Sequence, residues 1–125
     1  MFGGCARLTR ITIPNSVTSI GRSLFGGCVR LTSIIIGNNV TSIGDGMFYM
    51  CSSLRELEIP ETVTNIKAAA FTGCSSLKTI VIPKGVKSLP RNLLGNSYSD
   101  AYGLFAKCNA LESVTLPDGL ENISE

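Results

Sequence analysis

The 125-residue chain contains no histidine, no tryptophan and only three tyrosines. Without histidine the commonest general acid–base group is missing, and no paired carboxylates, phosphate-binding loop or Ser/His/Asp set is visible. Aromatic side chains on which bases could stack are scarce, and the 11 basic residues form no cluster along the sequence. We therefore expect neither an enzyme nor a nucleic-acid-binding protein.

Long apolar runs are also missing. None approaches the roughly 20 residues that span a bilayer. Met1 is followed directly by FGGCARL, without the basic and apolar regions of a signal peptide. The sequence therefore predicts no membrane insertion, and no signal or anchor is recognised in it. Hydrophobic residues at 44%, charged residues at 16% and a net charge of +2 are typical of one globular domain.

The sequence does contain an internal repeat, in which every phenylalanine is followed three residues later by a cysteine. The pairs are Phe2 and Cys5, Phe25 and Cys28, Phe48 and Cys51, Phe71 and Cys74, and Phe105 and Cys108. The unit reads F-x-x-C-x-x-L-x-x-[IVL]-x-[IL]-[PG]-x-x-[VL]-x-x-[IL]. A fixed period between about 20 and 50 residues indicates a solenoid.

Each unit carries one clear strand pattern. In LTRITIP, Ile11 and Ile13 face one side of a strand, whereas Arg10 and Thr12 face the other. Pro14 then ends the strand, because it cannot donate a ladder hydrogen bond. The V-x-x-I segment indicates a second short extended piece, followed by a turn or short helix. One unit cannot bury its apolar side alone, so we expect stacked units and a parallel sheet with five strands in a row.

The repeat resembles that of the BspA-like leucine-rich repeat proteins in its L-x-x-I-x-I-P, V-x-x-I-G and F-x-x-C-x-x-L segments. The resemblance covers residues 1–125 as a single domain of about five units, with an insertion near 92–104. It implies an α/β repeat solenoid, a right-handed superhelix of 23-residue units. The parallel β-sheet would line the concave side, and short helices or turns the convex side. It also implies a non-enzymatic, cell-surface or secreted protein associated with adhesion to host extracellular-matrix proteins or to other cells.

The cysteines allow several interpretations. A disulfide requires facing side chains, whereas equivalent side chains in a stack point in parallel and form a ladder. Zinc requires clustered ligands, and no two cysteines here are close in sequence. Five equivalent thiols cannot all be nucleophiles. We therefore predict buried packing residues, with Cys5 and Cys108 the most exposed, and expect no metal and no cofactor.

The outward strand positions are the candidate partner-binding residues, because this strip is where leucine-rich repeats usually meet a partner. They are Arg10, Thr12, Ser33, Ile35, Glu56, Glu58, Thr79, Val81, Ser113 and Thr115. The alternative is an ordinary exposed sheet face, since single exposed apolar residues are normal.

The insertion supplies the other candidates. The interval from Phe71 to Phe105 is 34 residues instead of 23, and the extra stretch holds Tyr98, Asp100 and Tyr102. Tyrosine among Ser, Gly and Asn is typical of adaptable recognition loops. A tolerated surface excursion is the alternative, because lengthening a loop costs little closure entropy.

Two further alternatives remain open. Neither end carries a polar capping unit, so we expect a fragment of a longer array or end-to-end self-association. The second function hypothesis is an intracellular scaffold or structural spacer with no selective ligand of its own, because unpaired cysteines are compatible with a reducing compartment.

Overall fold

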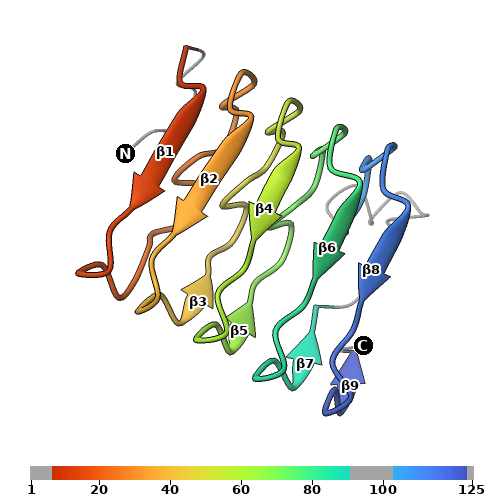
Figure 1. The fold of residues 1–125 in the computed structure, drawn as a ribbon. Coiled ribbons are helices and arrows are strands. Elements are labelled where there is room, and N and C mark those ends of the chain that lie inside the picture. Colours follow the sequence, from red (N-terminus) through yellow and green to blue (C-terminus); the bar gives the residue numbers. More distant parts are fainter. Residues whose placement is uncertain (1–6, 91–102, 124–125) are drawn as a thin grey trace.

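The computed structural model describes residues 7–90 and 103–123, and the long strands of these ranges lie in a row (Figure 1). They are β1 (Arg10–Ile13), β2 (Ser33–Ile36), β4 (Glu56–Glu58), β6 (Thr79–Val81) and β8 (Ser113–Thr115). All recorded pairings are parallel: Arg10 is opposite Ser33, Ser33 is opposite Glu56, and Thr79 is opposite Ser113. The predicted parallel strands are therefore confirmed.

The V-x-x-I segments form a second series of short strands. They are β3 (Ser42–Ile43), β5 (Asn65–Ile66), β7 (Ser88–Leu89) and β9 (Asn122–Ile123), with β3 parallel to β5 and β7 parallel to β9. The equivalent segment of the first unit, residues 17–20, forms no strand. Turns connect the strands, and the described residues contain no helix. Short helices or turns were expected between the strands, and the described segments there are turns.

The expected continuous sheet is interrupted between the third and fourth units. The described strands form the groups β1-β2-β4 and β6-β8, and the short strands also pair only within each side of this boundary. The units remain joined at the turn that carries the phenylalanine. There the N–H groups of Gly46, Phe48 and Met50 donate to the carbonyls of Ala68, Ala70 and Thr72, at 3.0, 2.9 and 2.7 Å. These bonds hold the stack together where the strands are not hydrogen-bonded to each other.

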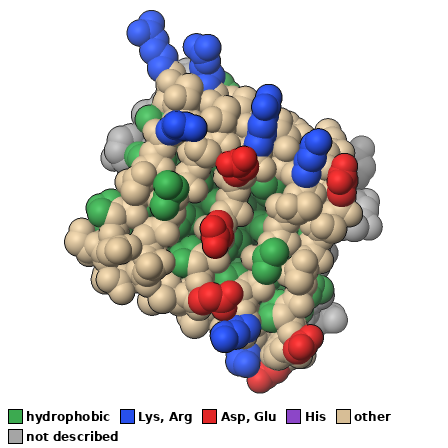
Figure 2. All heavy atoms as spheres, in the orientation of Figure 1, with side chains coloured by type: hydrophobic (Ala, Val, Ile, Leu, Met, Phe, Trp, Pro, Cys, Tyr) green, Lys and Arg blue, Asp and Glu red, His purple; other side chains and the backbone are tan. Residues whose placement is uncertain are grey.

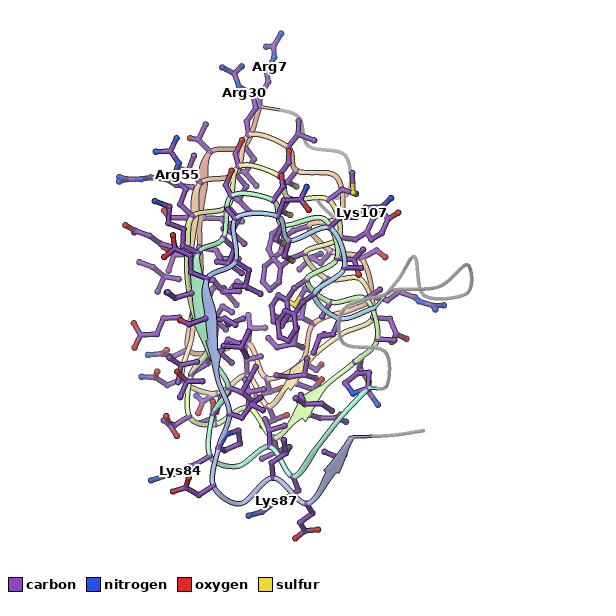
Figure 3. The ribbon with its side chains drawn as sticks, turned by 90° about the vertical axis from the view of Figure 1, so that its right-hand side faces the viewer. Arg7, Arg30, Arg55, Lys84, Lys87 and Lys107 are labelled. Atoms are coloured by element: carbon purple, nitrogen blue, oxygen red, sulfur yellow. The ribbon has the colours of Figure 1, made fainter. Side chains whose placement is uncertain are left out.

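The core runs through the stack between the strands and the turns (Figure 3). Phe25, Phe48, Phe71 and Phe105 form a continuous column, with 5.9 Å between successive ring centroids and interplanar angles of 9°, 7° and 5°. The repeat leucines, including Leu31, Leu54 and Leu77, are fully buried beside them. Most inward positions predicted from the repeat therefore make up the core, but Leu116 in the fifth unit is 43% exposed.

The cysteines form a ladder of thiol hydrogen bonds. The Sγ atoms of Cys51, Cys74 and Cys108 donate to the carbonyls of Phe25, Phe48 and Phe71 in the preceding unit, at 3.1, 3.3 and 3.1 Å. Each of these carbonyls also accepts the N–H of the cysteine in its own unit. Two donors thus satisfy the two lone pairs of a buried oxygen.

The predicted packing role of the cysteines is confirmed for those that the structure describes. Cys28, Cys51, Cys74 and Cys108 are all buried. Cys108 is the most exposed of these four, as expected, at 9% against 0% for the other three, but it is still buried. Its thiol is held by the Phe71 carbonyl, which the sequence did not reveal. Cys5 lies outside the described residues.

Burial controls the chemistry of these thiols. Desolvation, with a smaller contribution from the neighbouring Cys28, raises the pKa of Cys51 to about 12. Desolvation also raises the pKa of Cys74 and the pKa of Cys108. The thiols therefore stay protonated at neutral pH and are poor nucleophiles.

This shift predicts a loss of stability in alkali. Because the folded-state pKa of Cys51 lies above its ordinary value of 9.0, the unfolded chain releases this proton first. Its stabilising contribution is complete below pH 9.0 and falls as the pH rises toward about 12. We expect the wild type to lose about 1.4 kcal/mol per pH unit more than Cys51→Ala over this window. Urea unfolding at a series of pH values measures both slopes, and equal slopes would contradict the prediction.

Candidate binding face and groove

The outward residues of the long strands form one surface, here called the strand face. Of the ten predicted positions, nine are exposed and Ser33 is half-buried. The parallel register aligns Arg10, Ser33 and Glu56 in one line, and Thr12, Ile35 and Glu58 in the next. On the neighbouring pair of strands, Thr79 is opposite Ser113 and Val81 is opposite Thr115.

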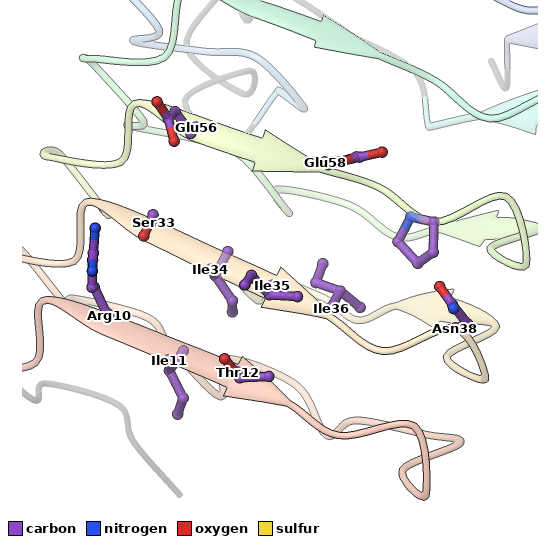
Figure 4. Close-up of a pocket in the computed structure, with 11 residues that line it drawn as sticks. Arg10, Ile11, Thr12, Ser33, Ile34, Ile35, Ile36, Asn38, Glu56 and Glu58 are labelled. Atoms are coloured by element: carbon purple, nitrogen blue, oxygen red, sulfur yellow. The ribbon is translucent and has the colours of Figure 1, made fainter.

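Part of the strand face is hollowed into a groove of about 620 Å³ over β1, β2 and β4 (Figure 4). The groove is lined by Arg10, Ile11, Thr12, Ser33, Ile34, Ile35, Ile36, Asn38, Glu56, Glu58 and Pro60. Six of the predicted residues are therefore brought together here. The four predicted residues on β6 and β8 do not line the groove; they are Thr79, Val81, Ser113 and Thr115. Tyr98, Asp100 and Tyr102 lie outside the described residues, so their predicted role stays a prediction.

Five residues that line the groove were not among the candidates. Three of them, Ile11, Ile34 and Ile36, belong to the inward positions of the strands, and the other two are Asn38 and Pro60. Pro60 follows the third strand directly, and Asn38 lies one residue beyond the glycine that takes the proline's place in the second unit. Both positions were visible as strand ends, but their place beside the groove depends on how neighbouring units stack. Asn38 is itself held by the preceding unit, since its N–H donates to Asn15 Oδ1 at 2.9 Å.

An exposed apolar side chain stands at the middle of the groove. Ile35 on β2 is 65% exposed, between Thr12 on β1 and Glu58 on β4. Val81 on β6 is similar at 58%. Single exposed apolar side chains are common on folded proteins. A β-branched side chain at the centre of a hollow, however, offers a partner an apolar contact surrounded by polar groups.

The groove also carries opposite charges on its two sides. Arg10 extends from β1, and Glu56 and Glu58 extend from β4, two strand spacings or about 10 Å away. Among the described residues the one ion pair is Arg22 with Asp45, at 3.8 Å on the surface. Arg10, Glu56 and Glu58 thus have no charged partner in the described chain, and a ligand could bind them without breaking an existing pair.

A second, more apolar hollow of about 390 Å³ lies beside the first unit. It is lined mainly by residues of the segment from Ile11 to Phe25. End-to-end self-association stays a prediction for this part of the molecule. Across the described ranges, no helix is long and apolar enough to cross a membrane. Within the same ranges, no group of three or more His, Cys, Asp or Glu side chains is placed to hold a metal ion.

The stacked parallel strands, the phenylalanine column and the solvent-facing strand surface define a leucine-rich repeat solenoid, a fold that generally mediates protein–protein interaction. The family model for the BspA type leucine rich repeat region matches six copies, over residues 1–100 and 101–125. The chain therefore belongs to the BspA-type leucine-rich repeat family. Comparison with curated proteins gives no match.

Solved structures share this architecture. A leucine-rich cell surface protein from Faecalibacterium prausnitzii is 36% identical, with a TM-score of 0.73, over 94% of this chain and 29% of that one. A leucine-rich repeat protein from Bacteroides ovatus is 32% identical, with a TM-score of 0.76, over 95% and 28%. The leucine-rich repeat protein of T. pallidum is 28% identical, with a TM-score of 0.75, over 98% and 63%. The chain thus spans between 28% and 63% of these three solved chains.

Proposed function

We propose that this chain is a non-enzymatic protein-binding module of a cell-surface or secreted, adhesion-type leucine-rich repeat protein. The observation that carries the proposal is the groove, in which exposed Ile35 lies between Arg10 on one side and Glu56 and Glu58 on the other. The similar protein from Faecalibacterium prausnitzii is described as a cell surface protein, which supports the location.

The groove suits a protein segment that crosses the strands. An apolar side chain of the partner would pack on Ile35, an acidic group would meet Arg10, and basic groups would meet Glu56 and Glu58. An apolar centre with charged surroundings is the usual anatomy of a protein interface. The opposite charges also set the direction of the partner, because a reversed segment would place like charges together. Host extracellular-matrix proteins are the partner class that the family resemblance suggests.

The cysteines do not decide between this function and an intracellular scaffold or spacer. Thiols outside disulfides are typical of reducing compartments. The thiols of Cys51, Cys74 and Cys108, however, are buried, and their raised pKa values keep them unreactive. They would resist oxidation in an oxidising compartment as well. The difference between the two functions is a selective partner, which a spacer lacks.

A binding screen against immobilised extracellular-matrix and plasma proteins tests the proposal. The test variant is Glu56→Lys with Glu58→Lys, and the control is Asp118→Lys with Glu121→Lys, which changes the net charge equally at exposed positions outside the groove. We expect the test variant to bind its partner about 30-fold more weakly, since removing one side of a charge pair costs about 2 kcal/mol or more. The control should bind like the wild type. Equal losses in both variants, or no selective partner for the folded chain, would favour the spacer.

A further inference from the structure

Five basic side chains gather along the edge of the molecule at which the long strands begin. Figure 2 shows Lys and Arg side chains along this upper border, and Figure 3 labels Arg7, Arg30 and Arg55 there. The basic row consists of Arg7, Arg10, Arg30, Arg55 and Lys78, all of which are exposed. It holds half of the ten basic residues that lie in the described ranges.

The repeat explains the alignment. Arg7 and Arg30 each precede a repeat leucine, whereas Arg55 and Lys78 each follow one. The backbone keeps the first three units in step here, because the N–H of Thr32 donates to the Thr9 carbonyl at 2.9 Å and the N–H of Arg55 donates to the Thr32 carbonyl at 3.1 Å. With about 4.8 Å between hydrogen-bonded parallel strands, the first three units place Arg7, Arg30 and Arg55 along roughly 10 Å, and Lys78 in the fourth unit extends the row. Residues far apart in the sequence thus form a cluster that the sequence did not reveal.

No member of the basic row forms an ion pair within the described part of the chain. The one ion pair recorded there, between Arg22 and Asp45, involves none of its members. The row ends at the last unit, where Glu112 occupies the position that Arg55 and Lys78 hold in theirs. Like charges so close together raise the local positive potential and favour an anionic ligand. Glu56 and Glu58 on the neighbouring strand face would repel such a ligand and confine it to the edge.

The surroundings of the row select among polyanions. The described aromatic residues are Tyr49, in the turn after Phe48, and the four phenylalanines of the buried column, so the row offers no platform for nucleic acid bases. The groove residue Ile35 lies on the strand face and not in the row. An acidic protein segment would therefore gain charge contacts without the apolar centre that protein interfaces need. A ligand recognised by charge alone must carry closely spaced anionic groups on a polar chain.

We propose that the basic row binds the sulfate and carboxylate groups of a linear acidic polysaccharide that lies across the starts of β1, β2, β4 and β6. Arg7, Arg30, Arg55 and Lys78 each belong to a different unit, so one extended chain contacts all four units in turn. Arginine suits such groups, because its planar guanidinium forms paired hydrogen bonds with oxyanions. The row shares Arg10 with the groove, but Arg7, Arg30, Arg55 and Lys78 do not line it, and the proposal does not rest on the proposed protein partner.

Binding to immobilised heparin, a sulfated polysaccharide, tests the proposal with charge-matched variants. The test variant carries Arg30→Glu, Arg55→Glu and Lys78→Glu. The control carries Lys67→Glu, Lys84→Glu and Lys87→Glu, three exposed lysines outside the row, and has the same net charge. We expect a loss of about 10-fold or more in the test variant, a change of less than about 2-fold in the control, and binding by the wild type that weakens with salt. An equal loss in both variants, or none in either, would overturn the proposal.

A gain of binding gives a second, independent measurement. Glu112→Lys extends the basic row into the fifth unit and should strengthen heparin binding about 3-fold, whereas Glu121→Lys makes the same charge change elsewhere and should not. The variant Glu56→Lys with Glu58→Lys removes two repelling carboxylates and should keep or strengthen heparin binding even if it loses a protein partner, which distinguishes this site from the groove. Equally tight, row-dependent binding of a single-stranded oligonucleotide would contradict the polysaccharide assignment. No gain from Glu112→Lys would also count against it.

Discussion

Replacing Phe48 with alanine is expected to lower the free energy of unfolding by about 3–5 kcal/mol, the range for emptying a buried aromatic site. Phe48 is fully buried, and its ring stacks on Phe25 and on Phe71 at 5.9 Å each. The substitution therefore removes two ring contacts and leaves a cavity at the interfaces with both neighbouring units. Because each unit of a solenoid contacts mainly its neighbours, both interfaces weaken together. Urea unfolding followed by circular dichroism measures the change.

Ile35→Ala is the matched control for this prediction. It also removes a large apolar side chain, but one that is 65% exposed, and it should change stability by no more than about 0.5 kcal/mol. Losses of similar size at both positions would mean that the phenylalanine column is not the centre of the core. A loss below about 1 kcal/mol for Phe48→Ala would lead to the same conclusion.

Gly37→Ala is expected to destabilise the chain by about 1–3 kcal/mol, although the repeat pattern suggests that a larger residue is accepted there. The other four units carry proline at this position, at Pro14, Pro60, Pro83 and Pro117. A Cβ on Gly37 would lie 2.6 Å from the carbonyl oxygen of Pro14 and 2.7 Å from that of Ile13. The obstacle is backbone, so relief requires the first and second units to move apart.

Gly21→Ala provides the comparison, because a Cβ at Gly21 meets nothing within 4 Å. That substitution should be neutral or should stabilise the chain by about 0.4–1 kcal/mol, since alanine restricts the unfolded chain more than glycine does. Gly37→Pro should also destabilise, against the repeat pattern, for the same steric reason. Equal unfolding midpoints for Gly37→Ala and Gly21→Ala would show that the units separate more easily than the contact suggests.

Much of the fold was predictable because the relevant signals are local. Alternation along LTRITIP assigns Ile13 to the interior and Thr12 to the surface, and a strand imposes this alternation whatever packs against it. The repeated F-x-x-C spacing likewise predicted buried cysteines in a ladder, as found for Cys28, Cys51 and Cys74. Cys108 is the most exposed of the described cysteines, as its place near a chain end predicted, but the packing of the fifth unit still buries it.

The binding surfaces were predictable only in part. The outward positions Arg10, Ile35 and Glu58 were identified from their own strands, but their meeting in one groove required the register of three units. The basic row was missed entirely. Its members occupy three different positions of the unit and are separated along the sequence, so scanning for a charge cluster could not find them. Superimposing the five units and reading each column for charge is the signal that would have helped.

The repeating unit, the inward and outward side of each strand, and the parallel stacking could be predicted from the order of the amino acids, because these follow from side-chain periodicity and from the need to bury each unit's apolar side. The interruption between β4 and β6, the hydrogen bond from the Cys74 thiol to the Phe48 carbonyl, and the neighbours of each exposed charge are visible only in the folded chain. Those features depend on distances between units, and residues about one repeat apart become neighbours only when the units stack in a particular register.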